Sequence, residues 1–170
     1  MTLVLHSNDV RPSVMARRPE PADVPLVAAL FSEMQQHYGA PVTDEAAELA
    51  AHLACRPVTG EFDPRTIIAL CGDTVCGSIV LNVTFPASEL TRSLYVRDLY
   101  VARAMRRRGV GQVLLAAAAR LTLAEGFSAL DWTTEGANQA AQALYDATGA
   151  SRLNRTFYRL AGEGLLRLQG

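Results

Sequence analysis

The stretch YVARAMRRRGVGQVLLAAAA, residues 100–119, places positive charge and glycine directly before an apolar helix. Four arginines stand within six positions, and Gly109 and Gly111 then flank a single valine. Residues 92–101, which lead into this stretch and overlap its first two positions, are mostly apolar and of types favoured in strands. The pattern predicts a strand that ends near Val101, a basic turn, and a helix that begins near Gly111.

Such a turn is suited to a phosphate group, because the first turn of a helix leaves backbone N–H groups without partners at its positive end. Gly109 and Gly111 carry no side chain to keep a phosphate from the backbone, and Arg106, Arg107 and Arg108 can grip its oxygens. The alternative is a solvated basic loop, but the order of strand, arginines, glycines and helix favours an anionic ligand. The spacing matches neither a P-loop nor a Rossmann turn.

Local patterns predict the remaining elements of an α/β chain. A short strand precedes a turn with two prolines, and helices follow at 24–38 and 43–54, with Asp23 and Thr43 as their N-caps. A hairpin over 66–85 turns at Gly72 and Asp73. After the helix at 111–126 come a strand at 128–134, a helix at 138–149 and a closing strand within 156–168. The last strand–helix–strand passage predicts parallel pairing.

The composition limits the class of protein. At 170 residues and 49% hydrophobic, the chain is predicted to form a single domain over 1–170, with residues 1–11 as a loose terminus. No apolar run reaches the roughly 18 residues of a membrane span, so no membrane association is expected. A net charge of -1 argues against a nucleic-acid binder.

The three cysteines, Cys55, Cys71 and Cys76, lack the spacing of metal ligands, so no metal site is expected. With a two-residue turn at 72–73, Cys71 is expected opposite Thr74 and Cys76 opposite Ala69. This register argues against a cross-strand disulfide, and scattered free thiols favour a reducing cytoplasm.

A second pattern lies in the predicted helix at 138–149. Asn138 and Tyr145 are seven residues apart, which puts both on one helical face with Ala141 between them. A small residue there would let a flat or extended ligand approach. The alternative assigns Asn138 to a helix cap and Tyr145 to the edge of the core.

Residues 101–111, with the motif Arg106-x-x-Gly109-x-Gly111, resemble the acetyl-CoA signature of the GNAT N-acetyltransferase superfamily, and the order of elements is similar along nearly the whole chain. The resemblance implies a mixed sheet, mostly antiparallel, with a splayed parallel strand pair and helices around it. It implies acetyl-CoA as cosubstrate, with its pyrophosphate at the turn and its arm along the splayed strands. The cofactor-binding residues that it implies are Leu99, Tyr100, Val101, Arg106, Arg107, Arg108, Gly109, Val110, Gly111, Thr133, Asn138 and Ala141.

The same resemblance implies a catalytic residue. Tyr145 matches the family tyrosine that protonates the departing thiolate of coenzyme A, and Asn138 matches an asparagine near the cofactor arm. A phenol with a pKa near 10 is mostly protonated at neutral pH, so it can donate its proton without any shift of its pKa. Trp132 is expected to form a wall of the core or of the cofactor pocket.

Within the superfamily, LYVRDLYV, NQAAQALYDATGA and FYRLAGEGL look similar to the diamine branch, which acetylates spermidine, spermine or thialysine. This implies a small-molecule amine as acceptor, a homodimer, and Tyr38, Arg97 and Asp98 as substrate-binding residues. The branch carries an acid where Arg97 stands, so a polyamine should be repelled and an acceptor with a carboxylate favoured. Asp98 is expected on the opposite side of the strand from Arg97.

Several roles stay open at this stage. Glu33 and His37 are candidates for relaying the amine's proton, or are plain exposed helix residues, and no catalytic base is assigned. Two other functions remain, acetylation of a protein N-terminus or lysine, and binding of acyl-CoA without turnover. The presence of Tyr145 favours an enzyme.

Overall fold

A computed structural model describes residues 13–169 of the chain. They fall into two compact units that divide after Thr134, and each is described by itself. The predicted loose terminus, residues 1–11, lies outside the described residues. A single domain over 1–170 stays a prediction.

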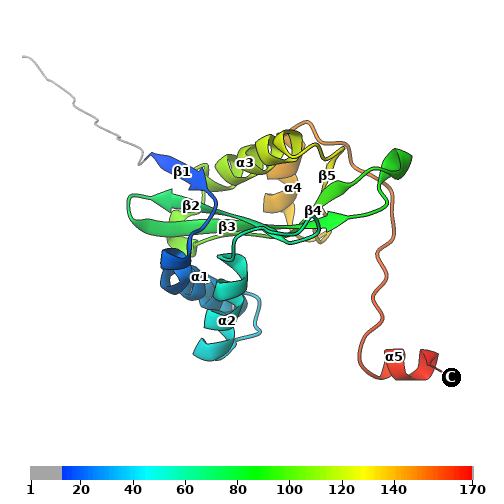
Figure 1. Cartoon of the computed structure of the whole chain (residues 1–170), viewed down its shortest axis with the longest axis horizontal. Helices are drawn as coiled ribbons and strands as arrows, with labels where there is room; N and C mark the ends of the chain where they lie inside the picture. Colours follow the sequence, from blue (N-terminus) through cyan, green and yellow to red (C-terminus); the bar gives the residue numbers. More distant parts are fainter. Residues whose placement is uncertain (1–12, 170) are drawn as a thin grey trace, which may run out of the picture. The chain divides into compact units, whose positions relative to one another are not determined.

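The first unit is built on one five-stranded sheet whose strands lie in chain order, β1-β2-β3-β4-β5 (Figure 1). The first three pairings are antiparallel, and β4 and β5 are parallel. This confirms the predicted mixed, mostly antiparallel sheet. The strands are β1 (Val14–Arg17), β2 (Arg65–Cys71), β3 (Thr74–Thr84), β4 (Ser93–Val101) and β5 (Leu130–Asp131).

The predicted hairpin is confirmed, with Cys71 opposite Thr74 across the turn at Gly72 and Asp73. The expected pairing of Cys76 with Ala69 is wrong, because a register shift places Gly77 opposite Ala69. One extra residue on β3 therefore bulges between the paired positions. All three cysteines are free thiols.

Helices cover the two faces of this sheet (Figure 1). The helices α1 (Val24–His37) and α2 (Asp44–Ala54) pack on one face, where Val27, Leu30 and Phe31 join the strand residue Ile68 in a buried cluster. The helix α3 (Val110–Ala124) packs on the other face. Its start lies close to β3, because a Cβ on Gly77 would stand 3.1 Å from Val110. The same Cβ would stand only 2.9 Å from the Tyr100 carbonyl oxygen, which is closer than a Cβ approaches backbone, so glycine at this position lets α3 pack against the sheet.

The two predicted caps differ in outcome. Thr43 caps α2 as predicted, since its hydroxyl accepts from the Ala46 N–H. Asp23 stands directly before α1, but its side chain makes no cap hydrogen bond there. Its carboxylate instead accepts two hydrogen bonds from Arg17, at 2.7 and 2.8 Å, and one from the Glu20 N–H. The nearby guanidinium attracts the carboxylate away from the helix end, and it holds the pKa of Asp23 below its ordinary value.

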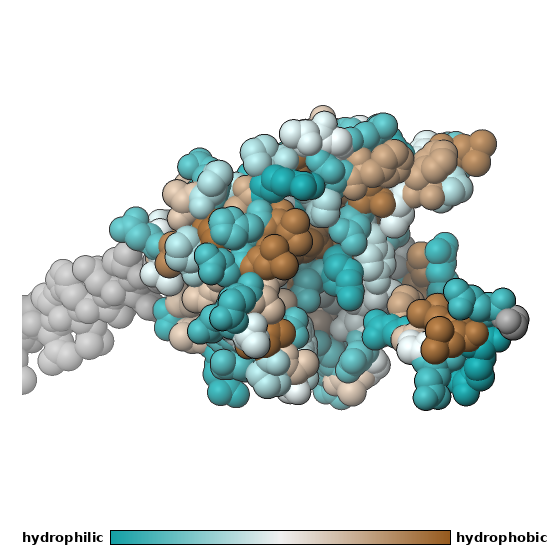
Figure 2. All heavy atoms as spheres, turned by 60° about the horizontal axis from the view of Figure 1, so that its bottom comes forward, coloured by the Kyte–Doolittle hydropathy of each residue, from teal (hydrophilic) through white to brown (hydrophobic). Residues whose placement is uncertain are grey.

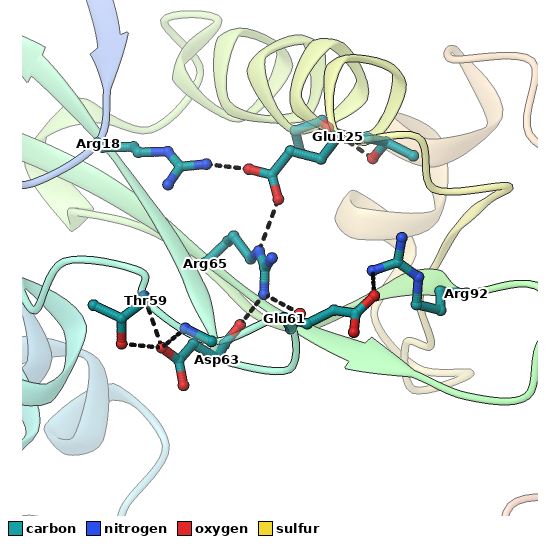
Figure 3. A network of polar contacts seen from close by, with 10 residues as sticks. Arg18, Thr59, Glu61, Asp63, Arg65, Arg92 and Glu125 are labelled. Atoms are coloured by element: carbon teal, nitrogen blue, oxygen red, sulfur yellow. Dashed lines mark hydrogen bonds and ion pairs between the residues drawn. The ribbon is translucent and has the colours of Figure 1, made fainter.

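The far end of α3 is fastened by a polar network (Figure 3). The Glu125 carboxylate pairs with Arg18, just after β1, and with Arg65 at the start of β2. Arg65 is only 5% exposed, and it also donates to the Glu61 and Asp63 carbonyl oxygens. A buried guanidinium needs such partners. The network therefore fixes the C-terminal end of the helix whose N-terminal end forms the basic turn.

The second unit contains α4 (Gln139–Asp146) and α5 (Glu163–Leu168). The closing strand predicted within 156–168 is wrong, because residues 150–161 pair with no strand of the described chain and 163–168 are helical. Strand-forming residue types do not suffice without a neighbour for the backbone N–H and C=O groups. In the later part, leucines with Glu163 and Arg167 favour a helix. The helix α5 exposes Leu165, Leu166 and Leu168. Figure 2 shows hydrophobic side chains on the surface of the C-terminal segment, at the right of the view.

Candidate functional site

The basic turn between β4 and α3 has the backbone shape of an anion-binding loop. A single 3-10 turn (Arg103–Met105) follows β4, and α3 begins at Val110, one residue before the predicted start. Arg107 has a φ of 62° and Gly109 a φ of 81°. Left-handed residues beside right-handed ones turn successive N–H groups toward a common point, which makes a concavity for anions.

The backbone N–H groups of this turn are open. The first hydrogen bond of α3 runs from the Val113 N–H to the Gly109 carbonyl oxygen at 3.1 Å. Within the described part of the chain, no acceptor faces the N–H groups of the six residues 107–112. A Cβ on Gly109 would meet nothing closer than 3.8 Å, so the space beside it is also open. Six adjacent donors and a helix dipole favour a negatively charged group.

The three arginines of the turn differ in their surroundings. Arg106 is half-buried, with its guanidinium 5.4 Å from the centre of the Tyr100 ring and its Nε donating to the Val101 carbonyl oxygen at 3.1 Å. Arg107 and Arg108 are exposed. The turn therefore combines one arginine docked on β4 with two that present charge to solvent.

The sheet opens beside this turn. β4 and β5 pair only at Leu94 with Leu130 and at Tyr95 with Asp131, so β5 is much shorter than the predicted strand at 128–134. Past Tyr95, the edge of β4 that faces away from β3 has no strand partner among the described residues. This limited pairing agrees with the splayed strand pair that the family resemblance implied. The Thr133 hydroxyl lies 2.6 Å from the Tyr95 hydroxyl, just past the last paired residue.

A β-bulge interrupts β4 at Arg97. Leu81 pairs with Val96, but its neighbour Val80 pairs with Asp98, so Arg97 is the extra residue. Bulges break the strict alternation of faces. The expectation that Arg97 and Asp98 point to opposite faces depended on that alternation, and the bulge removes its basis. The Arg97 side chain is exposed, whereas Asp98 is half-buried.

Asp98 lies on the face covered by α1 and α2. It pairs with Val80, which packs against the buried cluster on that face, and Tyr100 on the same strand belongs to the cluster itself. Burial raises the pKa of the Asp98 carboxyl above its ordinary value, and the Arg97 charge offsets part of this effect. A carboxylate with a raised pKa is a better proton acceptor near neutral pH.

The C-terminal end of α1 meets the end of β4 on this face. The Glu33 carboxylate accepts hydrogen bonds from the Tyr100 hydroxyl at 2.9 Å and from the Arg103 N–H at 2.7 Å. Burial, followed by the bond to Glu33, raises the pKa of Tyr100. The rings of His37 and Tyr38 lie 5.9 and 6.4 Å from the Tyr100 ring. Because the Tyr100 ring is buried, only its backbone is left for a cofactor.

Of the predicted residues in the second unit, Ala141 and Tyr145 lie in α4, and Asn138 is its N-cap residue. The Asn138 side chain caps the helix by accepting from the Ala141 N–H at 3.1 Å, so the alternative of a cap asparagine is confirmed. Ala141 and Tyr145 are half-buried. How these residues lie relative to the basic turn stays a prediction, as do their roles toward the cofactor.

The structure thus brings together the turn, the open edge of β4 and the end of α1. Sequence patterns did not indicate that Glu33 bonds to the turn, nor that β4 bulges at Arg97. Glu33 borders the apolar face of α1 formed by Leu30 and Met34. That position was the one sequence signal that Glu33 could lie near the protein interior and have a buried partner. The described residues contain no group of three metal-ligating side chains and no helix long and apolar enough to cross a membrane.

Solved structures share this fold. An integron cassette protein from the mobile metagenome of V. cholerae is 27% identical, with a TM-score of 0.77 over 92% of this chain and 98% of that one. AAC(6')-Iy, in complex with the bisubstrate analogue CoA-S-monomethyl-acetylneamine, is 18% identical, with a TM-score of 0.70 over 86% and 97%. Ribosomal-protein-alanine N-acetyltransferase from Brucella melitensis biovar Abortus 2308 is 16% identical, with a TM-score of 0.71 over 88% and 99%.

The last two similarities concern the fold alone. A diamine acetyltransferase is not among these three relatives, so that branch stays a prediction. The comparison with family models is more direct, because the model of the acetyltransferase (GNAT) family matches residues 27–150, which include the turn, the bulged strand and α4. The chain therefore belongs to the acetyltransferase (GNAT) family.

Proposed function

We propose that the protein transfers the acetyl group of acetyl-CoA to a primary amine of a small molecule by direct attack. The amine nitrogen forms a bond to the thioester carbonyl carbon, and the carbon–sulfur bond breaks. One proton leaves the attacking nitrogen, and another is delivered to the departing thiolate. The products are the N-acetylated amine and free coenzyme A, and no covalent enzyme intermediate is required.

The observation that carries the proposal is the row of open N–H groups over residues 107–112. A pyrophosphate bears negative charge that these donors and the α3 dipole stabilise. Arg107 and Arg108 add exposed positive charge beside them. Membership of the GNAT family and a relative solved with a CoA-containing analogue support acetyl-CoA as the anionic ligand.

For the departing thiolate, we assign Tyr145 as the general acid. The assignment is supported by its match to the family tyrosine and by its place on the same helical face as Ala141 and the cap residue Asn138. An ordinary phenol keeps its proton at neutral pH and can donate it as the sulfur departs.

For the amine's proton, we assign Asp98. Its half-buried carboxylate has a raised pKa, which brings its basicity closer to that of a useful catalyst at neutral pH. It lies on the face of the sheet that also carries Tyr100 and the end of α1. Tyr38, 58% exposed at that end, is assigned to the wall of the acceptor site.

For the acceptor itself, we assign a compound with a carboxylate beside its amine. Arg97 is exposed at a bulge next to Asp98, so a positive and a negative side chain adjoin on one strand. A guanidinium binds a carboxylate with two parallel hydrogen bonds. Pairing of Arg97 with Asp98 alone is the competing interpretation. A cytoplasmic homodimer, as in the diamine branch, completes the proposal.

The test is to incubate the protein with acetyl-CoA and a pool of amines, amino acids and N-terminal peptides, and to identify acetylated products by mass spectrometry. Acetylation of a small amine supports the proposal. Acetylation of the peptides alone would favour a protein acetyltransferase, as one relative with a similar fold is named. Binding of acetyl-CoA with no product would identify a domain that binds without turnover.

A further inference from the structure

One carboxylate on α1 holds the beginning of the basic turn. The Glu33 Oε1 atom accepts from the Arg103 N–H at 2.7 Å and from the Tyr100 hydroxyl at 2.9 Å. Both donors follow Glu33 by about seventy positions in the chain, so only the fold brings them together. Tyr100 is 3% exposed, so its side chain is almost entirely enclosed by protein.

The Arg103 bond falls at a decisive place in the turn. Just before it, the Ala102 N–H donates to the Cys76 carbonyl oxygen at 3.0 Å. Just after it, the Met105 N–H donates to the Ala102 carbonyl oxygen. The consecutive run of open N–H groups, residues 107–112, begins at Arg107. Glu33 is therefore the one side chain, among the described residues, that accepts from the backbone between the end of β4 and the open donors.

The Tyr100 bond extends this support to an arginine of the motif. With its hydroxyl held by Glu33, the Tyr100 ring has a defined orientation, and the Arg106 guanidinium lies 5.4 Å from its centre. The Arg106 Nε bond to the Val101 carbonyl oxygen completes the contact. Without Glu33, the buried hydroxyl loses its acceptor and the ring beneath Arg106 can turn.

We propose that Glu33 is a positioning residue that holds the acetyl-CoA turn in its binding shape through Arg103 and Tyr100. The proposal rests on the proposed binding of acetyl-CoA at this turn. It also replaces the role of proton relay that the sequence left open for Glu33, because the oxygen that faces the turn already accepts two hydrogen bonds.

The two roles predict opposite behaviour for a pair of substitutions. Glu33→Gln keeps an oxygen that can accept from both donors and removes only the charge and the basicity. A positioning role therefore predicts an acetyl-CoA Kd and a kcat within about threefold of the native values. Glu33→Ala removes the acceptor, and the Kd for acetyl-CoA should rise about tenfold or more, with the acceptor KM much less affected.

The experiment measures acetyl-CoA and CoA binding by calorimetry, and kcat and KM across pH, for both variants. Gln36→Ala, exposed on the same helix, controls for the change in helix propensity. Glu33→Ala leaves a buried hydroxyl unpaired, so the double variant Glu33→Ala with Tyr100→Phe provides a better folded form, and its Kd should also rise about tenfold.

The outcomes are separable. Glu33→Gln with a hundredfold lower kcat and an altered pH profile would identify a proton relay and overturn the proposal. Lower thermal stability in the alanine variants with an unchanged Kd would identify a purely structural residue and also overturn it. A native protein that binds neither acetyl-CoA nor CoA would contradict the proposed function itself, whatever the variants do.

Discussion

The Arg106 guanidinium lies over the ring of Tyr100, 5.4 Å from its centre, and its Nε donates to the carbonyl oxygen of the next residue, Val101. The first arginine of the motif Arg106-x-x-Gly109-x-Gly111 is thus docked on β4. The exposed Arg107 and Arg108 have no such support from the strand. If acetyl-CoA binds at this turn as proposed, backbone shape and charge contribute separately, and each contribution can be tested by its own substitutions.

Backbone shape is tested by two glycines that flank α3 and share a positive φ. Gly109 and Gly126, with φ of 81° and 72°, both lie in open space at opposite ends of the helix. Alanine at either should cost about 1–2 kcal/mol of stability, because left-handed backbone strains an L residue. Only Gly109→Ala should also weaken acetyl-CoA binding, measured by calorimetric titration. Equal affinities for the two variants would remove Gly109 from the site.

Gly111→Val tests close approach to the backbone. A branched side chain in the first turn of α3 should keep a phosphate from the open N–H groups. We expect acetyl-CoA affinity to fall tenfold or more, about 1.4 kcal/mol. The same titration decides, and unchanged affinity of a folded variant would rule out the turn as the pyrophosphate site.

Tyr145→Phe tests proton donation to the thiolate. The substitution keeps the ring and removes the hydroxyl, so kcat should fall by roughly 10² or more while the Kd for acetyl-CoA changes little. Tyr158→Phe is the matched control, because Tyr158 is 86% exposed. A native kcat in the Tyr145 variant would mean that the thiolate leaves without this residue.

Asp98→Asn tests the amine's proton acceptor and its burial together. The folded pKa of Asp98 is raised above the ordinary 3.8, so its charged form costs stability at pH 7, and this cost vanishes as pH falls below the unfolded value. The variant should therefore be more stable than the native protein at pH 7, with a difference that shrinks toward pH 4.

The same variant should lose roughly 10² in kcat, together with the acidic limb of the pH profile. Asp73→Asn, exposed in the hairpin turn, is the control for both urea denaturation and kinetics. A gain in stability with full activity would show that Asp98 is buried but not the base.

Arg97→Glu tests the acceptor class. In competition at equal concentrations, the native enzyme should prefer an amino acid or thialysine-like amine over spermidine, because a guanidinium repels a polyamine. Reversing the charge should move preference toward spermidine. Arg120→Glu makes the same change at an exposed site on α3. A native preference for spermidine would contradict Arg97 as a carboxylate anchor.

The sequence and the structure agree at several features that neighbouring residues decide, although the Asp23 cap is an exception. The hairpin turn at Gly72 and Asp73, the Thr43 cap and the start of α3 beside Gly109 follow from residues within a few positions of one another. The same is true of the glycine and arginine spacing that indicated an anion site. Such features can be read from local preferences for backbone conformation and hydrogen bonding.

Tertiary structure decided the features that depend on distant partners. The bulge at Arg97 arises from the register between β3 and β4, and it undid the expected alternation with Asp98. The closing strand did not form, because residues 150–161 have no strand neighbour in the described chain. The bond between Glu33 and Tyr100 joins residues 67 positions apart. The sequence by itself therefore determined the chemistry of the turn, while long-range packing determined which side chains support it, since no local preference encodes a contact between separate elements.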